Sequence, residues 1–233
     1  MKKILFAVSL LLATGLWMSL MINAGEKSIA LAVKVIREVS RKTETIDWTT
    51  AKKGELIYSG DHVRTGDRSI AIVKFTDNSI LRVREKSELE ILGEQKDGGL
   101  EKNVHLTRGE FSFDIQKQEN EKFIFTSPTS VAAIRGTRGT MVRLDSGDVV
   151  VVIEGLVNLL NSISNTGVDV GPGQTGISYT DGRVFVRDAT SNETTNAQRS
   201  VNAGNGGGRE NLLDIELKDD QNNKKRLRIR YKD

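Results

Sequence analysis

The sequence predicts an all-β fold, and three observations carry that prediction. From residue 28 to about residue 187 the chain runs in short segments in which apolar and polar residues alternate, the period-2 pattern of half-buried strands. Clusters of Gly, Asp, Asn and Ser separate these segments, as turns do. A sustained apolar period of 3.6 residues is missing after the N-terminal run, apart from a weak one over 30–39. We therefore expect a β-rich roll, a sandwich or a solenoid-like stack of about ten or more strands.

Individual segments justify this prediction. Ala71, Val73 and Phe75 lie on one side of a predicted strand, which turns at 76–79 and returns through 80–83. The same reasoning predicts further strands in several places: around Leu89 and Ile91, around Phe111, Phe113 and Ile115, along the doubly apolar run 149–153, and in a hairpin over 179–184 with an Asp-Gly turn.

The N-terminus has the pattern of an export signal. Lys2 and Lys3 precede 19 uncharged, mostly apolar residues over 4–22, and small residues follow. This length suits a cleaved signal peptide and a retained membrane anchor alike, so residues 1–24 are expected to be one of the two. Because the two lysines stay on the cytoplasmic side, the rest of the chain is expected in the periplasm or cell envelope, exported or anchored to the inner membrane.

Composition and charge narrow the chemistry. The 34 Lys and Arg residues against 31 Asp and Glu give a formal net charge of +3, and two of the lysines lie in the leader. A nucleic-acid partner is therefore not expected. The chain has no cysteine and two histidines, which excludes disulfides and thiolate metal sites. His62 and His105 are not spaced as metal ligands, so we expect no cofactor and no metal site.

The C-terminal region changes character twice. Residues 188–210 carry few and small apolar residues and are expected to form a flexible linker. Residues 211–233 then alternate again and predict a β-hairpin with one acidic and one basic strand. A register in which Leu217 faces Leu227 would place Glu216 opposite Arg228.

The basic strand of that hairpin leaves two interpretations open. It could be a patch that contacts an anionic lipid, a nucleic acid or an acidic glycan, with Arg226, Arg228 and Arg230 as the contact residues. It could equally be neutralised by the acidic strand that faces it.

Two glycine-rich motifs also have competing interpretations. Residues 171–176 match G-x-G-x-x-G, but a dinucleotide site needs a helix to begin there, and the sequence continues with a strand pattern, which favours a turn. In the run 135–140, Arg135 and Arg138 could grip a carboxylate or phosphate. Alternatively, the glycines permit a bulge or a close strand crossing, and the arginines are solvated or paired.

Catalysis is not expected. The sequence contains no phosphate loop, nucleophile elbow or serine-triad pattern. A hydrolase built on an unrecognised pair of carboxylates is the remaining enzymatic alternative, which a groove lined by two close carboxylates would support.

Seven segments together resemble the FecR family, named for an extracytoplasmic iron-dicitrate sensor. They are 60–66, 69–79, 106–111, 125–129, 133–137, 152–157 and 171–174. The residues that carry the pattern are Gly60, Asp61, Thr65, Gly66, Asp77, Gly109, Arg135, Gly136, Thr137, Glu154, Gly155, Gly173 and Gln174. Asn78 stands where the family pattern usually has Gly, and Asn also tolerates a left-handed backbone.

The resemblance implies a non-catalytic, β-rich domain of the bacterial envelope that senses or relays signals through contacts with another envelope or membrane protein. Three residues precede the apolar run, where the iron-sensing regulators have a cytoplasmic anti-sigma segment, so direct control of a sigma factor is not expected. The alternative is a structural envelope component that binds glycan or peptidoglycan through Arg135, Arg138 and the basic tail.

Overall fold

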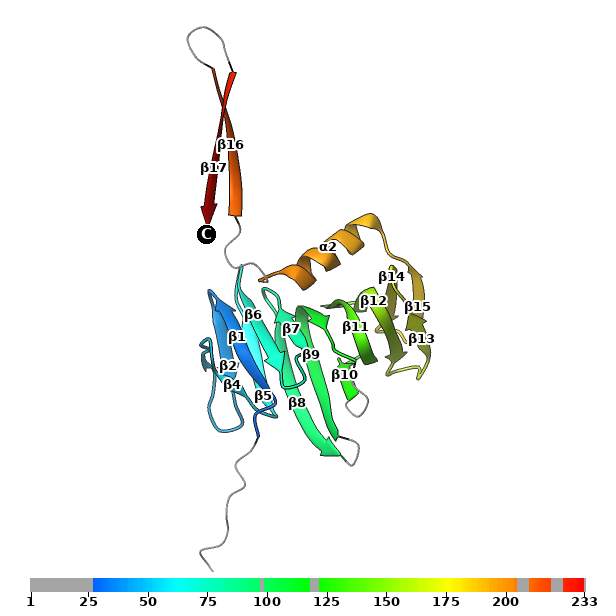
Figure 1. Cartoon of the computed structure of the whole chain (residues 1–233). Coiled ribbons are helices and arrows are strands. Elements are labelled where there is room, and N and C mark those ends of the chain that lie inside the picture. The colour runs from blue at the N-terminus through cyan, green and yellow to red at the C-terminus, as the bar shows by residue number, and fades with distance from the viewer. Residues whose placement is uncertain (1–26, 97–98, 118–121, 205–209, 219–223, 233) are drawn as a thin grey trace, which may run out of the picture.

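The computed structural model describes residues 27–96, 99–117, 122–204, 210–218 and 224–232. The prediction of an all-β fold is confirmed. One open, mixed sheet of 15 strands forms the body, a helix runs along its upper side, and a separate two-stranded sheet follows (Figure 1). The predicted leader, residues 1–24, lies outside the described residues.

The long strands of the body all begin at or after residue 88, and shorter strands lie both before and among them. In chain order they are β1 (Ala30–Ile36), β2 (Val39–Lys42), β3 (Thr49–Thr50), β4 (Leu56–Ile57), β5 (Asp61–Thr65), β6 (Ile70–Phe75), β7 (Ile80–Val83), β8 (Glu88–Lys96), β9 (Gly99–Asp114), β10 (Lys122–Thr126), β11 (Ser130–Leu144), β12 (Gly147–Asn161), β13 (Gly167–Val170), β14 (Gln174–Tyr179) and β15 (Val184–Asp188). The remaining elements are α2 (Ser191–Asn202), β16 (Glu210–Lys218) and β17 (Lys224–Lys232).

Three long strands bend the sheet into a roll. The first half and the second half of each of these strands pair with different neighbours. The first half of β9 pairs with β8 and β10, and its second half pairs with β7 and β11. The first half of β11 pairs with β10 and its second half with β9. β12 likewise pairs with β14 through its first half and with β13 through its second. The predicted roll is therefore made by bending long strands and not by closing a barrel.

Glycines mark the points where these strands bend. Gly109 in β9 has φ of 86° and Gly155 in β12 has φ of 84°, a region that L residues with a Cβ rarely adopt. A side chain on Gly109 would collide with Ser87, and one on Gly155 would collide with the backbone of Gly136 and Thr137. Close approach of the two bent parts of the sheet therefore needs glycine at both positions.

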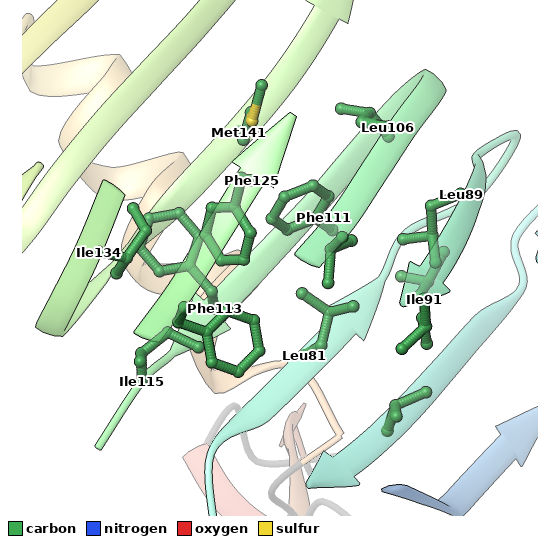
Figure 2. Packing of buried hydrophobic residues seen from close by; sticks show 14 of the residues in the cluster. Leu81, Leu89, Ile91, Leu106, Phe111, Phe113, Ile115, Phe125, Ile134 and Met141 are labelled. Carbon is green, nitrogen blue, oxygen red and sulfur yellow. The ribbon is translucent and has the colours of Figure 1, made fainter. Parts of the chain in front are cut away.

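The core lies inside the bend and joins both parts of the roll. Phe111 and Phe113 of β9 pack against Phe125 of β10 with ring centroids 4.7 and 4.8 Å apart (Figure 2). Leu81 of β7 and Leu89 of β8 belong to the same cluster and are fully buried. Burial alternates at the start of β8 and in the first half of β9, as the period-2 pattern predicts, whereas in β6 every residue except Lys74 is buried.

The turn chemistry expected from the sequence is also present. Asn78 adopts a left-handed backbone with φ of 68° between β6 and β7. Asp181 and Gly182 turn the chain between β14 and β15. Residues 171–173 form a turn that leads into strand β14, which excludes the dinucleotide interpretation of the glycine motif. The weak helical period over 30–39 belongs to strands β1 and β2.

The prediction of a flexible linker over 188–210 is wrong for residues 191–202, which form helix α2. The helix begins with a capping box, in which Thr190 and Glu193 satisfy each other's backbone N–H groups. Ala197 and Val201, four residues apart, are buried. Small side chains suffice to bury this face because the helix lies close to the sheet. The low hydrophobicity of the segment therefore did not indicate that it lacks structure.

The last turn of α2 is fixed to the sheet by hydrogen bonds. Arg82 Nε donates to the carbonyl oxygen of Ala203 over 3.0 Å, and Ser112 Oγ donates to that of Ser200 over 2.9 Å. Ser200 Oγ in turn donates to Glu110 Oε1 over 2.9 Å. These contacts join β7 and β9 to the end of the helix.

The C-terminal hairpin forms in a register that differs from the expected one by two residues. Leu217 lies opposite Lys225, Glu216 opposite Arg226 and Asp214 opposite Arg228. Acidic positions still face basic ones, because the charges repeat every two residues and a two-residue shift preserves their pairing. Residues 219–223, between the two strands, lie outside the described residues.

Candidate functional site

The motif of residues 135–140 forms a bulge at the bend of β11. The β11–β12 register shifts on either side of Arg138, and Gly136 has φ of 60°. Thr137 Oγ1 donates toward the carbonyl oxygen of Leu156 over 3.0 Å and accepts from the Leu156 N–H over 3.3 Å. The bulge interpretation of this motif therefore holds, and it explains why β11 changes its neighbour at this point.

The two arginines of the motif do not act as a pair. Arg138 Nη1 donates to Glu154 Oε1 over 2.9 Å, and Arg138 Nε lies 3.6 Å from Asp114 Oδ2. Arg138 is therefore neutralised inside the structure, as its structural interpretation anticipated, and Glu154 of the family pattern serves as its partner. Among the described residues, Arg135 forms no ion pair and no side-chain hydrogen bond, and it is exposed.

Arg135 stands at the rim of an apolar groove of about 620 Å³. Its lining comes from β10, β11 and β12: Phe123, Ile124, Ala133, Ile134, Arg135, Leu156 and Asn158. Phe123 and Ile134 are buried and belong to the core cluster, so the floor of the groove is rigid. The groove therefore presents a preformed apolar surface beside a single cation.

Strand register explains why these residues meet. Ile124 lies opposite Ala133, and Ala133 lies opposite Asn158, which makes one row across three strands. Arg135 lies opposite Leu156 in the next row on the same face. Leu156 is 53% exposed and extends the apolar lining of the groove to the surface.

The arginines of the tail lie elsewhere in the chain. Arg226, Arg228 and Arg230 belong to β17, opposite Glu216, Asp214 and Leu212 of β16. Two of the three therefore face an acidic position, as the neutralised-strand interpretation requires, and their side chains are outside the described part of the structure.

The polar residues of the family pattern hold turns together. Asp61 Oδ2 accepts from the Tyr58 N–H over 2.7 Å and from Arg41 Nη2 over 2.6 Å. Thr65 Oγ1 accepts from the Ser87 N–H over 3.1 Å.

Asp77 and Gln174 act in the same way in two other turns. Asp77 Oδ1 accepts from the Ser79 N–H over 2.9 Å, and Gln174 Oε1 accepts from the Gly171 N–H over 2.8 Å. Outside residues 135–155, the remaining positions of the family pattern are glycines that lie at strand ends or bends: Gly60, Gly66, Gly109 and Gly173.

A metal site or a hydrolytic site would depend on the histidines and carboxylates, and their contacts can be followed in the part of the chain that the structure describes. Groups of three or more His, Cys, Asp or Glu side chains that could hold a metal ion do not occur there. His105 Nδ1 is 3.0 Å from Thr126 Oγ1, and His62 packs against Trp48. No carboxylate from the described ranges lines the groove beside Arg135.

Sequence reasoning found Arg135 but missed the apolar half of the groove. Ile124 and Ala133 sit in ordinary alternating segments, and Leu156 follows a glycine, so nothing in the local pattern sets them apart. Their proximity depends on the register of β10 with β11 and of β11 with β12, which the alternating pattern does not specify.

Comparison with known proteins identifies one region of the chain. Residues 61–158 match the family model described as FecR protein. The chain carries a FecR domain. No curated protein matches the chain. Two crystal structures of a proposed anti-sigma factor from Parabacteroides distasonis, at 1.65 and 2.50 Å resolution, are similar to it in fold.

Those two structures share 15% and 14% sequence identity with this chain, at TM-scores of 0.49 and 0.48. Each comparison covers 57% of this chain and 62% of the other, so the chain spans less than two thirds of that protein.

The FecR domain contains every strand that forms the groove. Its matched region begins at Asp61, the start of β5, and ends at Asn158 in the second half of β12. A FecR domain indicates a regulatory module of signal transduction. Within the described residues, no helix is long and apolar enough to cross a membrane.

Proposed function

We propose that this chain is a non-catalytic signalling module of the bacterial envelope, and that its FecR domain works by binding another envelope or membrane protein. The observation that carries the proposal is the groove beside Arg135. It is an apolar surface with an arginine at its rim that forms no ion pair among the described residues. Apolar centres with polar rims and a prominent arginine are typical of protein interfaces. The export pattern of residues 1–24 supports a location outside the cytoplasm.

The shape and charge of the groove define the partner's chemistry. The exposed side chain of Leu156 and the row formed by Ile124 and Ala133 call for an apolar side chain on the partner. Arg135 calls for a neighbouring carboxylate, because a guanidinium that becomes desolvated in a contact needs an opposite charge. We therefore infer a partner segment that presents one apolar anchor next to one acidic residue.

Crosslinking in the native envelope tests this function. A photo-reactive residue placed at position 156 is expected to give a discrete protein adduct, which Arg135→Glu should abolish. Position 163 is the matched control, since Ile163 is 57% exposed and Leu156 is 53% exposed. Equal adducts at both positions, or fractionation of the protein with the cytoplasm, would contradict the proposal.

The alternative is an envelope component that binds acidic glycan through exposed arginines. Its remaining support is Arg135 and the basic strand β17, since Arg138 already pairs with Glu154 and Asp114. Binding to peptidoglycan or acidic polysaccharide driven by charge should fade as salt rises. Retention that survives high salt and depends on Leu156 would favour the protein-binding function instead.

A further inference from the structure

A second cavity, of about 410 Å³, gathers three arginines from distant parts of the chain. Arg68 precedes β6, Arg84 follows β7, and Arg199 lies in the last turn of α2. The complete lining is Ile36, Arg68, Ser69, Ile70, Arg84, Glu85, Arg199, Ala203 and Gly204. It shares no residue with the groove beside Arg135, so its role is independent of the proposed function.

Topology explains the convergence. Ile36 ends β1 opposite Ile70, the first residue of β6, and β7 ends one residue before Arg84. The three strand ends therefore meet at one end of the sheet. The hydrogen bond from Arg82 to the carbonyl oxygen of Ala203 fixes the end of α2 at this same end, above β6 and β7 (Figure 1).

The three guanidinium groups carry charge that the described residues do not neutralise. None of them lies within 4.0 Å of a carboxylate of a described residue. Arg199 Nη1 makes one weak contact of 3.4 Å, to the neutral amide of Asn196. Arg68 and Arg199 are exposed and Arg84 is partly buried, so water screens these charges until an anion binds between them.

Glu85 is the single acid in the lining. One of its oxygens, Oε2, already accepts the backbone N–H of Arg68 over 2.7 Å. Three guanidinium groups against one carboxylate leave an excess of two positive charges in the cavity.

The carbonyl end of α2 does not cancel this excess. A helix C-terminus is electronegative because its last carbonyl groups lack partners within the helix. Here Arg82 Nε donates a hydrogen bond to the carbonyl oxygen of Ala203, and Lys34 Nζ donates one to the carbonyl oxygen of Gly204 over 3.3 Å. Arg82 and Lys34 therefore compensate the negative end of the helix dipole. The arginines that line the cavity are not needed for that role.

We propose that this cavity binds a small ligand through a dianionic oxyanion group of the phosphate or sulfate type. Guanidinium groups bind tetrahedral oxyanions through paired N–H donors, and two net positive charges match a dianion. The volume exceeds that of the oxyanion alone, and Ile36 and Ile70 offer an apolar wall for the rest of the ligand. A bound ligand would also join the end of α2 to the turns before β6 and after β7.

Calorimetric titration of the purified full chain tests this site. Inorganic phosphate and sulfate are titrated at constant ionic strength, with acetate as the monovalent probe. We expect phosphate or sulfate to bind more tightly than acetate, and Arg84→Gln and Arg199→Gln each to weaken that binding by about tenfold or more, since each removes a charge-assisted hydrogen bond.

Arg108→Gln is the matched control, because Arg108 is exposed, pairs with Glu88 and lies outside the cavity. It should keep the wild-type affinity. Phosphate should also raise the thermal midpoint of the wild type and of Arg108→Gln but not that of the double variant of Arg84 and Arg199. Acetate binding as tight as phosphate, or a double variant with wild-type affinity, would overturn the proposal, and so would the absence of binding at millimolar phosphate.

Discussion

Lys102 Nζ lies 2.8 Å from Asp77 Oδ2, and the side chains are 0% and 4% exposed. Lys102 belongs to β9, and Asp77 lies in the turn between β6 and β7. The same carboxylate orders that turn by accepting the Ser79 N–H. This buried ion pair therefore ties a turn of the FecR pattern to the longest strand of the sheet.

Removal of one partner of this pair should be strongly destabilising, because it leaves the other charge buried. We expect Lys102→Met to lower the free energy of unfolding by about 3–5 kcal/mol in urea denaturation. Lys96→Met is the control: Lys96 pairs with Glu101 over 2.9 Å at a half-exposed site, and its loss should change the free energy of unfolding far less. Similar losses for both variants would show that burial does not govern the Lys102 pair.

The stability of the protein should depend on acid pH through Glu193 of helix α2. Two hydrogen bonds from Arg187 and further ones from Thr190 lower the pKa of Glu193 to about 2, against an ordinary value of 4.5. Because the folded-state pKa is depressed, the stabilisation is complete above the ordinary value and is lost as the pH falls from about 4.5 to about 2. Unfolding free energies measured across that interval should fall for the wild type.

Glu193→Gln should remove this part of the pH dependence and flatten the curve below pH 4.5. Glu44→Gln, at an exposed position, should keep the wild-type slope. A Glu193→Gln curve that parallels the wild type would show that this carboxylate does not link α2 to the sheet.

The bend of β12 should depend on the size of residue 155. Gly155→Ala should destabilise the protein by more than the roughly 1–3 kcal/mol of backbone strain, because the new methyl group also meets the backbone of Gly136 and Thr137. Gly54→Ala separates the two effects, since Gly54 has φ of 90° with open space around it. In chemical denaturation, Gly155→Ala should lose more free energy of unfolding than Gly54→Ala. Equal losses would show that backbone strain at positive φ accounts for the whole effect and the steric contacts for none of it.

The strands could be predicted from the sequence because their signal is local. Ala71, Val73 and Phe75 are buried on one side of β6 as predicted, and Ile70 and Ile72 on the other side are buried as well. Asn78 was predictable as a left-handed turn residue for the same reason.

Helix α2 was missed because its buried positions are held by small and polar residues. Ala197, Ser200 and Val201 are buried although the segment as a whole is polar. The Thr190 to Glu193 capping box and the spacing of Ala197 and Val201 were the signals that could have revealed it.

The sites depend on long-range geometry that alternation does not encode. Lys102 lies in the first half of β9, which pairs with β8 and β10, and its burial beside Asp77 depends on how the sheet brings that half of β9 to the turn before β7. The arginines at 68, 84 and 199 converge through strand ends and a docked helix. The three strands of the Arg135 groove likewise meet through sheet order, which sequence reasoning left open between several architectures.

The affinity of the full chain for the partner captured at position 156 tests the central claim most directly. The wild type and Ile163→Asp should bind that partner equally, whereas Leu156→Asp should bind at least about tenfold more weakly, since burying an unpaired carboxylate in an apolar contact is unfavourable. Equal affinity for all three proteins would contradict a contact surface in the groove beside Arg135.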